Sequence, residues 1–223
     1  MSFMEPMSVD KSRPRLLVAD DHVIFADTLR VFLEKSYSVQ GVVSDGRAMV
    51  EEAIRLRPDL MVVDVGMPVL NGLDAVRQLM GQAPNMRFVF LTMHDDSDLA
   101  AAALELGPFG FVLKHSGGQE LLRAIEHVLH GQAYVTPKLR AQNWVETKAR
   151  ARQVPTELTP RQREIVQLYG EGRSLKQIAG LLNLSVKTVE FHKHHIMESF
   201  NLDSNAALVV FAVNRGLIYL SPD

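Results

Sequence analysis

Four short apolar runs in the first half of the chain each end on a chemically active residue. Leu16–Ala19 precedes Asp20 and Asp21, Leu60–Val63 precedes Asp64, Phe88–Leu91 precedes Thr92, and Phe111–Leu113 precedes Lys114. Continuous apolar runs separated by helix-length segments are typical of buried parallel strands. Because such strands gather their ligands at their carboxyl ends, three carboxylates, a hydroxyl and an ammonium group are expected in one crevice.

The segments between these runs carry apolar residues at helical spacing. Such stripes lie within 24–33, 50–54, 73–80, 99–106 and 121–129, and Tyr37–Val43 reads as a further strand. Alternation of strands and helices predicts an α/β, doubly wound, five-stranded parallel sheet. Gly131 is the expected stop of its last helix.

The crowded carboxylates suggest phosphoryl-transfer chemistry. Three neighbouring carboxylates repel one another unless a hard divalent cation lies among them, and Mg²⁺ is the expected ion. A carboxylate beside Mg²⁺ can act as a nucleophile towards a phosphoryl group, with an ammonium and a hydroxyl neutralising the phosphate oxygens. Asp64 is the favoured nucleophile, because the turn residues that follow it leave the Gly66 carbonyl free to reach the metal. Taken alone, Asp20 and Asp21 would more often be a helix cap.

Charge and composition set wider bounds. Residues 1–134 carry 12 Lys and Arg against 18 Asp and Glu, whereas residues 135–223 carry 12 against 8. An acidic half and a mildly basic half favour two domains with different partners, and the basic half suits a polyanion such as DNA. The absence of cysteine favours a reducing cytoplasm. Neither a signal peptide nor a membrane span is expected.

The second half of the chain changes character after a linker. Residues 135–157 contain Pro137, Pro155, several basic residues and the single tryptophan, Trp144, with a possible helix around Leu139–Ala151. From Leu158 the pattern is helical: Thr159 caps one helix, Ser174 starts a second, and the turn 183–185 leads to a third. Two short helices joined by a tight turn are the helix-turn-helix plan.

The motifs of the first half resemble those of a known family. The DD pair, DVGMP, the Thr of FVFLT and the Lys of FVLK resemble the flavodoxin-like receiver domain of bacterial two-component response regulators, from about Arg15 to Gly131. The resemblance implies these roles: Asp64 as phosphoacceptor, Asp20, Asp21, Asp64 and Gly66 at the Mg²⁺ site, Thr92 and Lys114 as phosphate partners, and Phe111 as an aromatic switch. Phe111 may equally be plain core from its sequence alone.

The stretch from Leu158 resembles the LuxR-type helix-turn-helix, so the whole chain resembles a NarL/FixJ-type response regulator. This divides the chain into a disordered tail (1–14), a receiver domain (15–134), a linker (135–157) and a DNA-binding domain (158–223). The third C-terminal helix turns Val189, Ile196 and Phe200 inward, and its expected DNA-binding residues are Lys187, Thr188, Glu190, Phe191, Lys193 and His194. The lysines could also simply be solvated. The chain departs from the family at Gln162, Ser199-Phe200 and Asn201. Ser199 stands where the family usually has a lysine, so a phosphate contact expected of the family is lost.

The resemblance implies a transcriptional regulator switched by a sensor histidine kinase, binding promoter DNA as a homodimer when phosphorylated, with no membrane partner and no enzymatic role beyond slow self-dephosphorylation. Two alternatives stay open. One is a signalling protein acting through protein partners with weak or no DNA binding, which only Ser199 supports. The other is a phosphatase-class enzyme, but such sites generally need a second acid where Gly66 stands. A histidine-bound metal is disfavoured, since His192, His194 and His195 lie mostly on different helix faces and His127 and His130 lack a third ligand.

Overall fold

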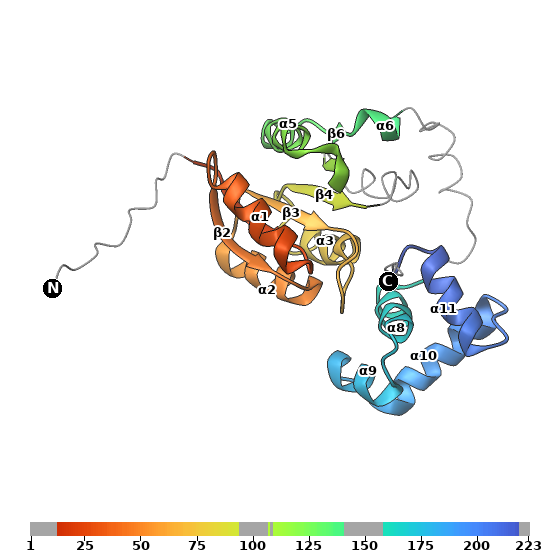
Figure 1. Ribbon diagram of the computed structural model, residues 1–223. Coiled ribbons are helices and arrows are strands. Elements are labelled where there is room, and N and C mark those ends of the chain that lie inside the picture. Colours follow the sequence, from red (N-terminus) through yellow and green to blue (C-terminus); the bar gives the residue numbers. More distant parts are fainter. Residues whose placement is uncertain (1–12, 94–106, 108, 141–157, 219–223) are drawn as a thin grey trace.

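A computed structural model describes residues 13–93, 107, 109–140 and 158–218 and divides them into an α/β part and an all-helical part (Figure 1). The first is built on a parallel sheet with the strand order β2-β1-β3-β4-β5-β6. Its strands are β1 (Arg15–Ala19), β2 (Ser38–Val43), β3 (Leu60–Asp64), β4 (Phe88–Thr92), β5 (Gly110–Leu113) and β6 (Tyr134–Val135). β1, β3, β4 and β5 are the four apolar runs, so the expected doubly wound sheet is confirmed.

The sheet has six strands rather than the expected five. β6 is only two residues long and pairs with β5 through Gly110 opposite Tyr134 and Phe111 opposite Val135. The Thr136 backbone N–H then donates to the Phe111 carbonyl at 3.0 Å. A strand this short carries no periodicity, which is why the sequence pattern missed it. The segment expected to be a linker from residue 135 therefore begins inside the sheet.

Several expectations fall outside the described residues. These are the helical stripe within 99–106, most of the disordered tail expected over residues 1–14, and most of the linker with Trp144. At the start of the linker, α6 (Pro137–Arg140) forms one short helical turn.

The helices cover the two faces of the sheet in pairs. α1 (Val23–Leu33) and α5 (Gly118–Leu129) pack on one face, whereas α2 (Gly46–Leu56) and α3 (Gly72–Met80) pack on the other. Each face buries its own apolar cluster, so β1, β3 and β4 are apolar on both sides. The reactive residues therefore lie at the carboxyl ends of strands whose buried side chains are otherwise apolar. Gly131, with φ 76°, follows α5 as the expected stop.

The C-terminal part consists of α8 (Pro160–Gly170), α9 (Leu175–Leu182), α10 (Val186–Ser199) and α11 (Asn205–Asn214). Thr159 and Ser174 cap α8 and α9 as expected, and Asn183 with φ 52° forms the turn before α10. The fourth helix, α11, was not expected as a separate element. It packs Leu208 and Ala212 against Val166 of α8 and Ile196 of α10.

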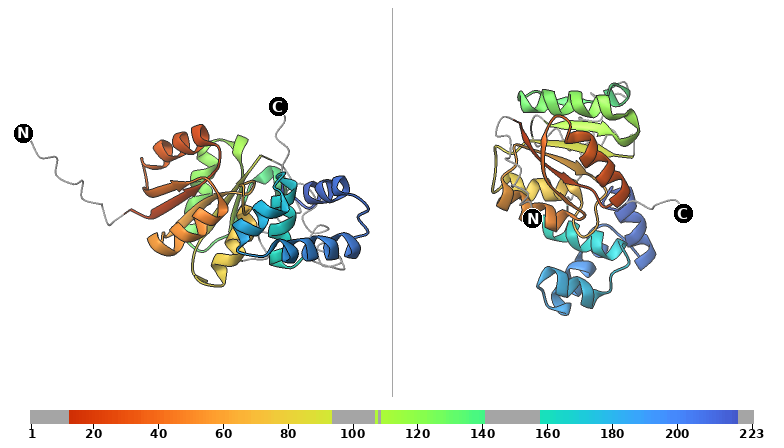
Figure 2. Two further views of the ribbon diagram at one scale, coloured as in Figure 1. Left: turned by 90° about the horizontal axis from the view of Figure 1, so that it is seen from below. Right: turned by 60° about the vertical axis from the view of Figure 1, so that its left-hand side comes forward.

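α8 lies between the sheet and the other C-terminal helices (Figure 2). Its residues make polar contacts with α2, α3 and the loop after β3. Glu164 and Gln167 of α8 are buried, with exposed fractions of 7% and 1%. The two parts of the described chain are thus joined by a polar contact that excludes water.

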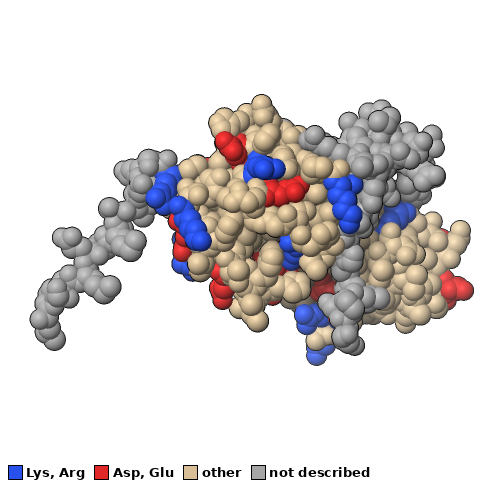
Figure 3. Space-filling model, turned by 45° about the horizontal axis from the view of Figure 1, so that its top comes forward, with Lys and Arg blue, Asp and Glu red and all other residues tan. Residues whose placement is uncertain are grey.

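Charges are scattered on the face of the molecule shown in Figure 3, where cationic and anionic side chains alternate with uncharged ones. No single-sign patch gathers on that face. This agrees with the small formal net charge of −2.

Candidate functional site

The carboxyl ends of four strands meet at one edge of the sheet. Asp20 follows β1, Asp64 ends β3, Thr92 ends β4 and Lys114 follows β5. All of these strands are parallel neighbours, and β3 to β5 are in register through Asp64 opposite Leu91 and Thr92 opposite Leu113. The structure therefore brings together the reactive residues that the sequence pattern placed in one crevice.

Lys114 is held between two carboxylates. Its Nζ lies 2.8 Å from Asp64 Oδ2 and 2.8 Å from Asp20 Oδ2. The ammonium also lies 4.9 Å from the centre of the Phe25 ring of α1, close enough for a cation–π contact. Since the Asp20 and Asp64 side chains are almost entirely buried, these charges depend on one another for stability.

Burial and pairing act in opposite directions on the pKa values of these groups. Burial raises the pKa of Asp64 above its ordinary value, and the nearby Asp20 carboxylate adds to this, although Lys114 and the Gly66 N–H oppose it. For Lys114, burial lowers the pKa, but Asp64 and Asp20 more than compensate and the pKa is raised. The two carboxylates therefore favour the charged ammonium of Lys114, whereas burial opposes ionisation of the Asp64 carboxyl.

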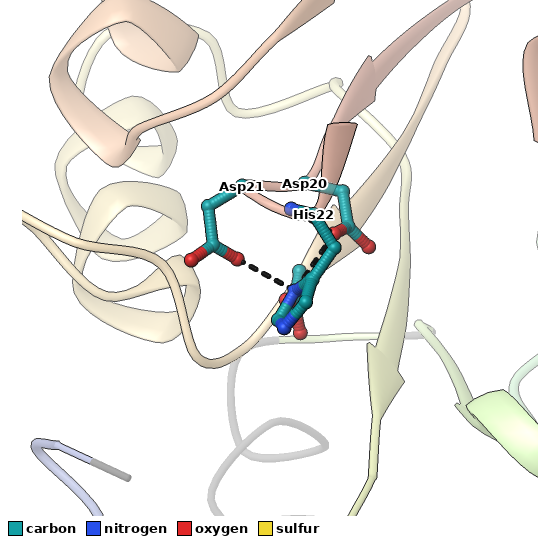
Figure 4. A group of neighbouring side chains, drawn as sticks. Asp20, Asp21 and His22 are labelled. Carbon is teal, nitrogen blue, oxygen red and sulfur yellow. Dashed lines mark hydrogen bonds and ion pairs between the residues drawn. The ribbon is translucent and has the colours of Figure 1, made fainter. Parts of the chain in front are cut away.

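His22 belongs to the same cluster, which sequence reasoning missed. Its Nδ1 lies 3.0 Å from Asp21 Oδ1 and 3.3 Å from Asp20 Oδ1, so its ring lies beside the two carboxylates (Figure 4). The backbone N–H of His22 donates to Asp20 Oδ1 at 2.9 Å. Asp20 thus bonds to the residue just before α1, but the N-cap of α1 is His22, whose side chain does not cap this helix. The only signal for His22 in the sequence is its position directly after Asp21.

The donor set suits a hard divalent cation. Asp20, Asp21, His22 and Asp64 each offer a ligand atom, and these atoms all lie within 4.8 Å of one another. The buried Asp20 Oδ2 lies 2.8 Å from the Lys114 ammonium, and the buried Asp21 Oδ1 lies 3.0 Å from His22 Nδ1. Carboxylate oxygens gathered in this way are the ligands that Mg²⁺ or Ca²⁺ would coordinate. Within the described residues this is the only such group of acidic and histidine side chains, and none of the other histidines belongs to one.

Thr92 and Phe111 occupy the positions expected of them on β4 and β5. Thr92 is 2% exposed, and Phe111 is fully buried with its ring centre 6.2 Å from that of Phe90. The buried ring is also what a plain core residue would show. The structure therefore leaves the switch role of Phe111 as an expectation.

The outer face of α10 is open. Phe191 is 66% exposed and His194 is 74% exposed at its side chain, while Lys187 and Glu190 are also exposed. Val189 and Ile196 are buried on the opposite face, as expected. The large exposed ring of Phe191 lies near the rings of His192 and His195 on the same helix. It marks a surface made to contact something else.

Two of the expected DNA-binding residues are engaged within the domain. The Nζ of Lys193 lies 4.6 Å from the centre of the Tyr169 ring and donates to Asn205 Oδ1 at 2.6 Å. The Thr188 hydroxyl lies 2.8 Å from the Ser185 hydroxyl at the start of α10. Both residues lie on α10, but neither points freely into solvent as Lys187 does.

The departures at the ends of these helices have local explanations. Gln162 completes a capping box by accepting from the Thr159 backbone N–H at 2.8 Å, a role that glutamate and glutamine share. Asn201 adopts φ 51°, a conformation that asparagine tolerates better than most residues. Phe200 packs against Phe211 of α11, with ring centres 4.7 Å apart and ring planes inclined at 46°. These substitutions preserve the fold, and Ser199 is exposed beside His195.

Comparison with known proteins agrees with this architecture. Residues 16–126 match the model of the response regulator receiver domain, and residues 156–212 match that of the bacterial regulatory proteins of the luxR family. The chain is 30% identical over 214 residues, 92% of its length, to the oxygen regulatory protein NreC of Staphylococcus carnosus, of which it covers 99%.

Solved structures show the same folds. A LuxR-family two-component response regulator from Aurantimonas sp. is 30% identical, with a TM-score of 0.57 over 61% of this chain and 99% of that one. The response regulator RcsB of Salmonella typhimurium superposes with a TM-score of 0.63 at 24% identity, over 91% of this chain and 98% of that one. This second likeness concerns the fold.

The fold and the two matched segments define a regulator with a receiver domain and a DNA-binding domain. The chain belongs to the NarL/FixJ-type two-component response regulators. It is a DNA-binding regulator of transcription in a two-component system, and receiver domains of this family take their phosphoryl groups from sensor kinases. Among the helices of the described segments, none is long and apolar enough to cross a membrane.

Proposed function

We propose that Asp64 is the phosphoacceptor of this regulator and that Mg²⁺ lies between Asp20, Asp21, Asp64 and the Gly66 carbonyl. The observation that carries the proposal is the position of Lys114 Nζ, 2.8 Å from oxygens of both Asp64 and Asp20. A buried ammonium at this place can pair with the carboxylates before phosphoryl transfer and with a phosphoryl oxygen after it. The site acts as a phosphoacceptor rather than as an enzyme that turns over a separate substrate.

In the proposed transfer, an Asp64 oxygen attacks the phosphorus of the phosphohistidine of the kinase, and the P–N bond breaks as the new P–O bond forms. Bound Mg²⁺ would neutralise phosphoryl oxygens during this step. Lys114 contacts one phosphoryl oxygen and the Thr92 hydroxyl donates to another. Burial of the site strengthens each of these contacts by excluding water.

The acyl phosphate adds about 1.5 to 2 negative charges at Asp64. These charges draw Thr92 and Lys114 inward, and Phe111 follows into the space beside Thr92. The surface of β5 then changes, and the regulator forms a homodimer. A dimer is needed because a helix-turn-helix protein reads two half-sites. Since promoter DNA is the target, the regulator acts in the cytoplasm.

On DNA, α10 lies in the major groove. Lys187, Thr188 and Lys193 are the proposed phosphate contacts, and Glu190, Phe191 and His194 are the proposed base contacts. Glutamate can accept a hydrogen bond from cytosine N4, and the Phe191 ring can meet a thymine methyl. Lys193 must leave Asn205 to reach a phosphate. The exposed ring of Phe191 supports this placement.

The phosphoacceptor is tested by Asp64→Asn in the full chain. We expect the fold to persist, because the side chain is nearly isosteric, and hydroxylamine-sensitive labelling by acetyl phosphate with Mg²⁺ to disappear, because an amide is not a nucleophile. Asp27→Asn, an exposed acid on α1, is the matched control and should label normally. Label retained on the Asp64 variant would disprove the assignment.

The DNA-binding proposal is tested by gel shifts with genomic promoter fragments, with and without beryllofluoride as a phosphate mimic. We expect the mimic to raise both the mass in solution and the affinity for specific fragments. Equal mass and equal affinity in the two states would mean that phosphorylation does not control this regulator through dimerisation.

A further inference from the structure

The loop that leaves the proposed phosphoacceptor is held by the DNA-binding domain. Three alternate backbone groups of this exit loop, residues 65–71, bind two side chains one turn apart on and just after α8. Gln167 Nε2 donates to the Met67 carbonyl at 3.0 Å, and Gln167 Oε1 accepts from the Asn71 N–H at 2.8 Å. Glu171 Oε1 accepts from the Val69 N–H at 3.1 Å. The exit loop thus donates two hydrogen bonds to side chains of the other domain and accepts one from them.

Gln167 suits this role because its amide has no charge to desolvate. It is 1% exposed, and both ends of the amide are bonded to the exit loop. Its Nε2 also donates to Glu171 Oε1 at 2.8 Å, which fixes the two side chains relative to each other. A buried polar side chain satisfied in this way is rigid, and its loss leaves two loop groups without partners.

The centre of the exit loop is strained. Val69 has φ 69°, a region that a β-branched residue enters only when its surroundings require it. The Leu70 N–H donates to the Pro68 carbonyl across Val69 at 2.8 Å, forming a turn of three residues. A three-residue turn of this hand is rare. The Val69 side chain packs against the cluster formed by Ile165, Leu168 and Ile178 of the DNA-binding domain.

The receiver itself fixes the loop on both sides of Val69. A Cβ on Gly46 would lie 1.9 Å from the Leu70 carbonyl oxygen, and one on Gly72 would lie 2.2 Å from the Asp64 carbonyl oxygen. The backbone at the two ends of the loop is therefore pressed against α2 and α3. Beyond these contacts within the receiver, the Val69 side chain packs against the DNA-binding domain.

We propose that Gln167 and Val69 are positioning residues for the metal site, and that docking of the DNA-binding domain raises the affinity of the receiver for Mg²⁺. The inference rests on the proposed function, because Gly66 lies in the same loop, three residues before Val69. When the domain undocks, Val69 relaxes towards negative φ and the backbone that carries the Gly66 carbonyl shifts. Docking and metal binding then favour each other equally, as linkage requires.

The docked arrangement leaves the outer face of α10 exposed, with Phe191 66% exposed. α8 rather than α10 makes the contact with the exit loop. The effect of docking is therefore on the exit loop of the receiver and not on the access of DNA to α10.

The test measures equilibrium binding of Mn²⁺, as a spectroscopic substitute for Mg²⁺, to the unphosphorylated full chain. Gln167→Ala removes both bonds to the loop and should weaken Mn²⁺ binding about fivefold or more, within the range typical of coupled sites. Initial labelling by acetyl phosphate at limiting Mg²⁺ should slow by a similar factor. Gln132→Ala, an exposed glutamine after α5, is the matched control and should bind as the wild type does.

A second substitution separates positioning from a general loss of structure. Val69→Gly lets the loop keep a positive φ without the other domain. In this background Gln167→Ala should change Mn²⁺ affinity less than twofold. Gln167→Glu keeps the size of the side chain but sets a carboxylate against the Met67 carbonyl, and should weaken Mn²⁺ binding as Gln167→Ala does.

Mn²⁺ affinity within twofold of the wild type in both Gln167 variants would overturn the proposal. The proposal would also be overturned if Gln167→Ala weakened Mn²⁺ binding by the same factor in the wild type and in the Val69→Gly background. Failure of the proposed function is distinguishable: Asp64→Asn would then keep its label, whatever the Gln167 variants do to Mn²⁺ binding.

Discussion

The two candidate sites of this regulator are built in opposite ways. The proposed phosphorylation site gathers buried groups from the ends of four strands, and Asp20, Asp64 and Thr92 are each less than 5% exposed. The proposed DNA-binding surface comes from one helix, α10, on which Phe191 and His194 are largely exposed. In the first site, removal of one charge leaves others buried without partners. In the second, exposed side chains contact water in the free protein, so their removal should change the affinity for DNA more than the free energy of unfolding.

The largest effect is expected from Lys114→Met, which removes the ammonium but keeps most of the volume. Asp20 and Asp64 then face each other without their cation, and the free energy of unfolding in excess EDTA should fall by about 3 kcal/mol. Excess Mg²⁺ should narrow the difference, because the metal replaces the lost charge. Urea denaturation measures both values. Lys35→Met, at an exposed position, should change stability little, and an equal loss there would remove the contrast between the sites.

The next effect concerns base recognition. Glu190→Ala should leave stability unchanged and relax the preference at one base pair by about 1–3 kcal/mol. Binding to a set of single-base variants of the best genomic site measures this preference. Asp203→Ala, an exposed acid between α10 and α11, is the control. Identical base preferences in the wild type and the Glu190 variant would show that this side chain does not read DNA.

A smaller, sequence-independent effect is expected from Lys187→Ala. Binding to all sequences should weaken alike, and the slope of log K against log salt should flatten by about 0.9 for each protomer that loses a phosphate contact. Lys193→Ala should change the slope less, because Lys193 first has to leave Tyr169 and Asn205. Ser199→Lys should steepen the slope. An unchanged affinity and slope for Lys187→Ala would place α10 outside the groove.

The smallest effect concerns the pH dependence of the contact between the domains. Burial raises the pKa of Glu171 above its ordinary value of 4.5, although Gln167, Val69 and Arg173 oppose this. The docked form therefore binds a proton on the Glu171 carboxyl more tightly than the undocked form does. Docking should be strongest below the ordinary pKa and weaken as the pH rises through the raised one.

Glu171→Gln removes this titration and should abolish the pH dependence. Hydrogen exchange of the Val69 and Asn71 amides, corrected for intrinsic rates, measures docking in both proteins. Parallel pH profiles in wild type and variant would assign the dependence to another group.

The comparison of the two sites also explains what could be predicted from the sequence. Buried parallel strands appear as uninterrupted apolar runs, so Asp20, Asp64, Thr92 and Lys114 were identifiable as the residues at which those runs stop. The two faces of α10 followed from helical spacing, since Val189 and Ile196 are buried and Phe191 is exposed. Both inferences use local patterns, and the parallel topology brings the carboxyl ends of the strands together at one edge of the sheet.

What the sequence did not reveal depends on contacts between distant segments. Helical spacing offers no reason to bury the polar residues Glu164 and Gln167 of α8, yet they are buried against the receiver. α11 is apolar over most of its surface and so gives no clear helical stripe. The positive φ of Val69 is likewise not identified by any local pattern.

The open face of α10 has a kinetic consequence. If α10 were covered, DNA would have to wait for a rarely populated open form, and the observed affinity would fall in proportion to that population. Here the first encounter with promoter DNA needs no opening step. The association rate should then follow diffusion and ionic strength, as for an unobstructed protein, and differences between the phosphorylated and unphosphorylated forms should lie chiefly in how long the complex survives.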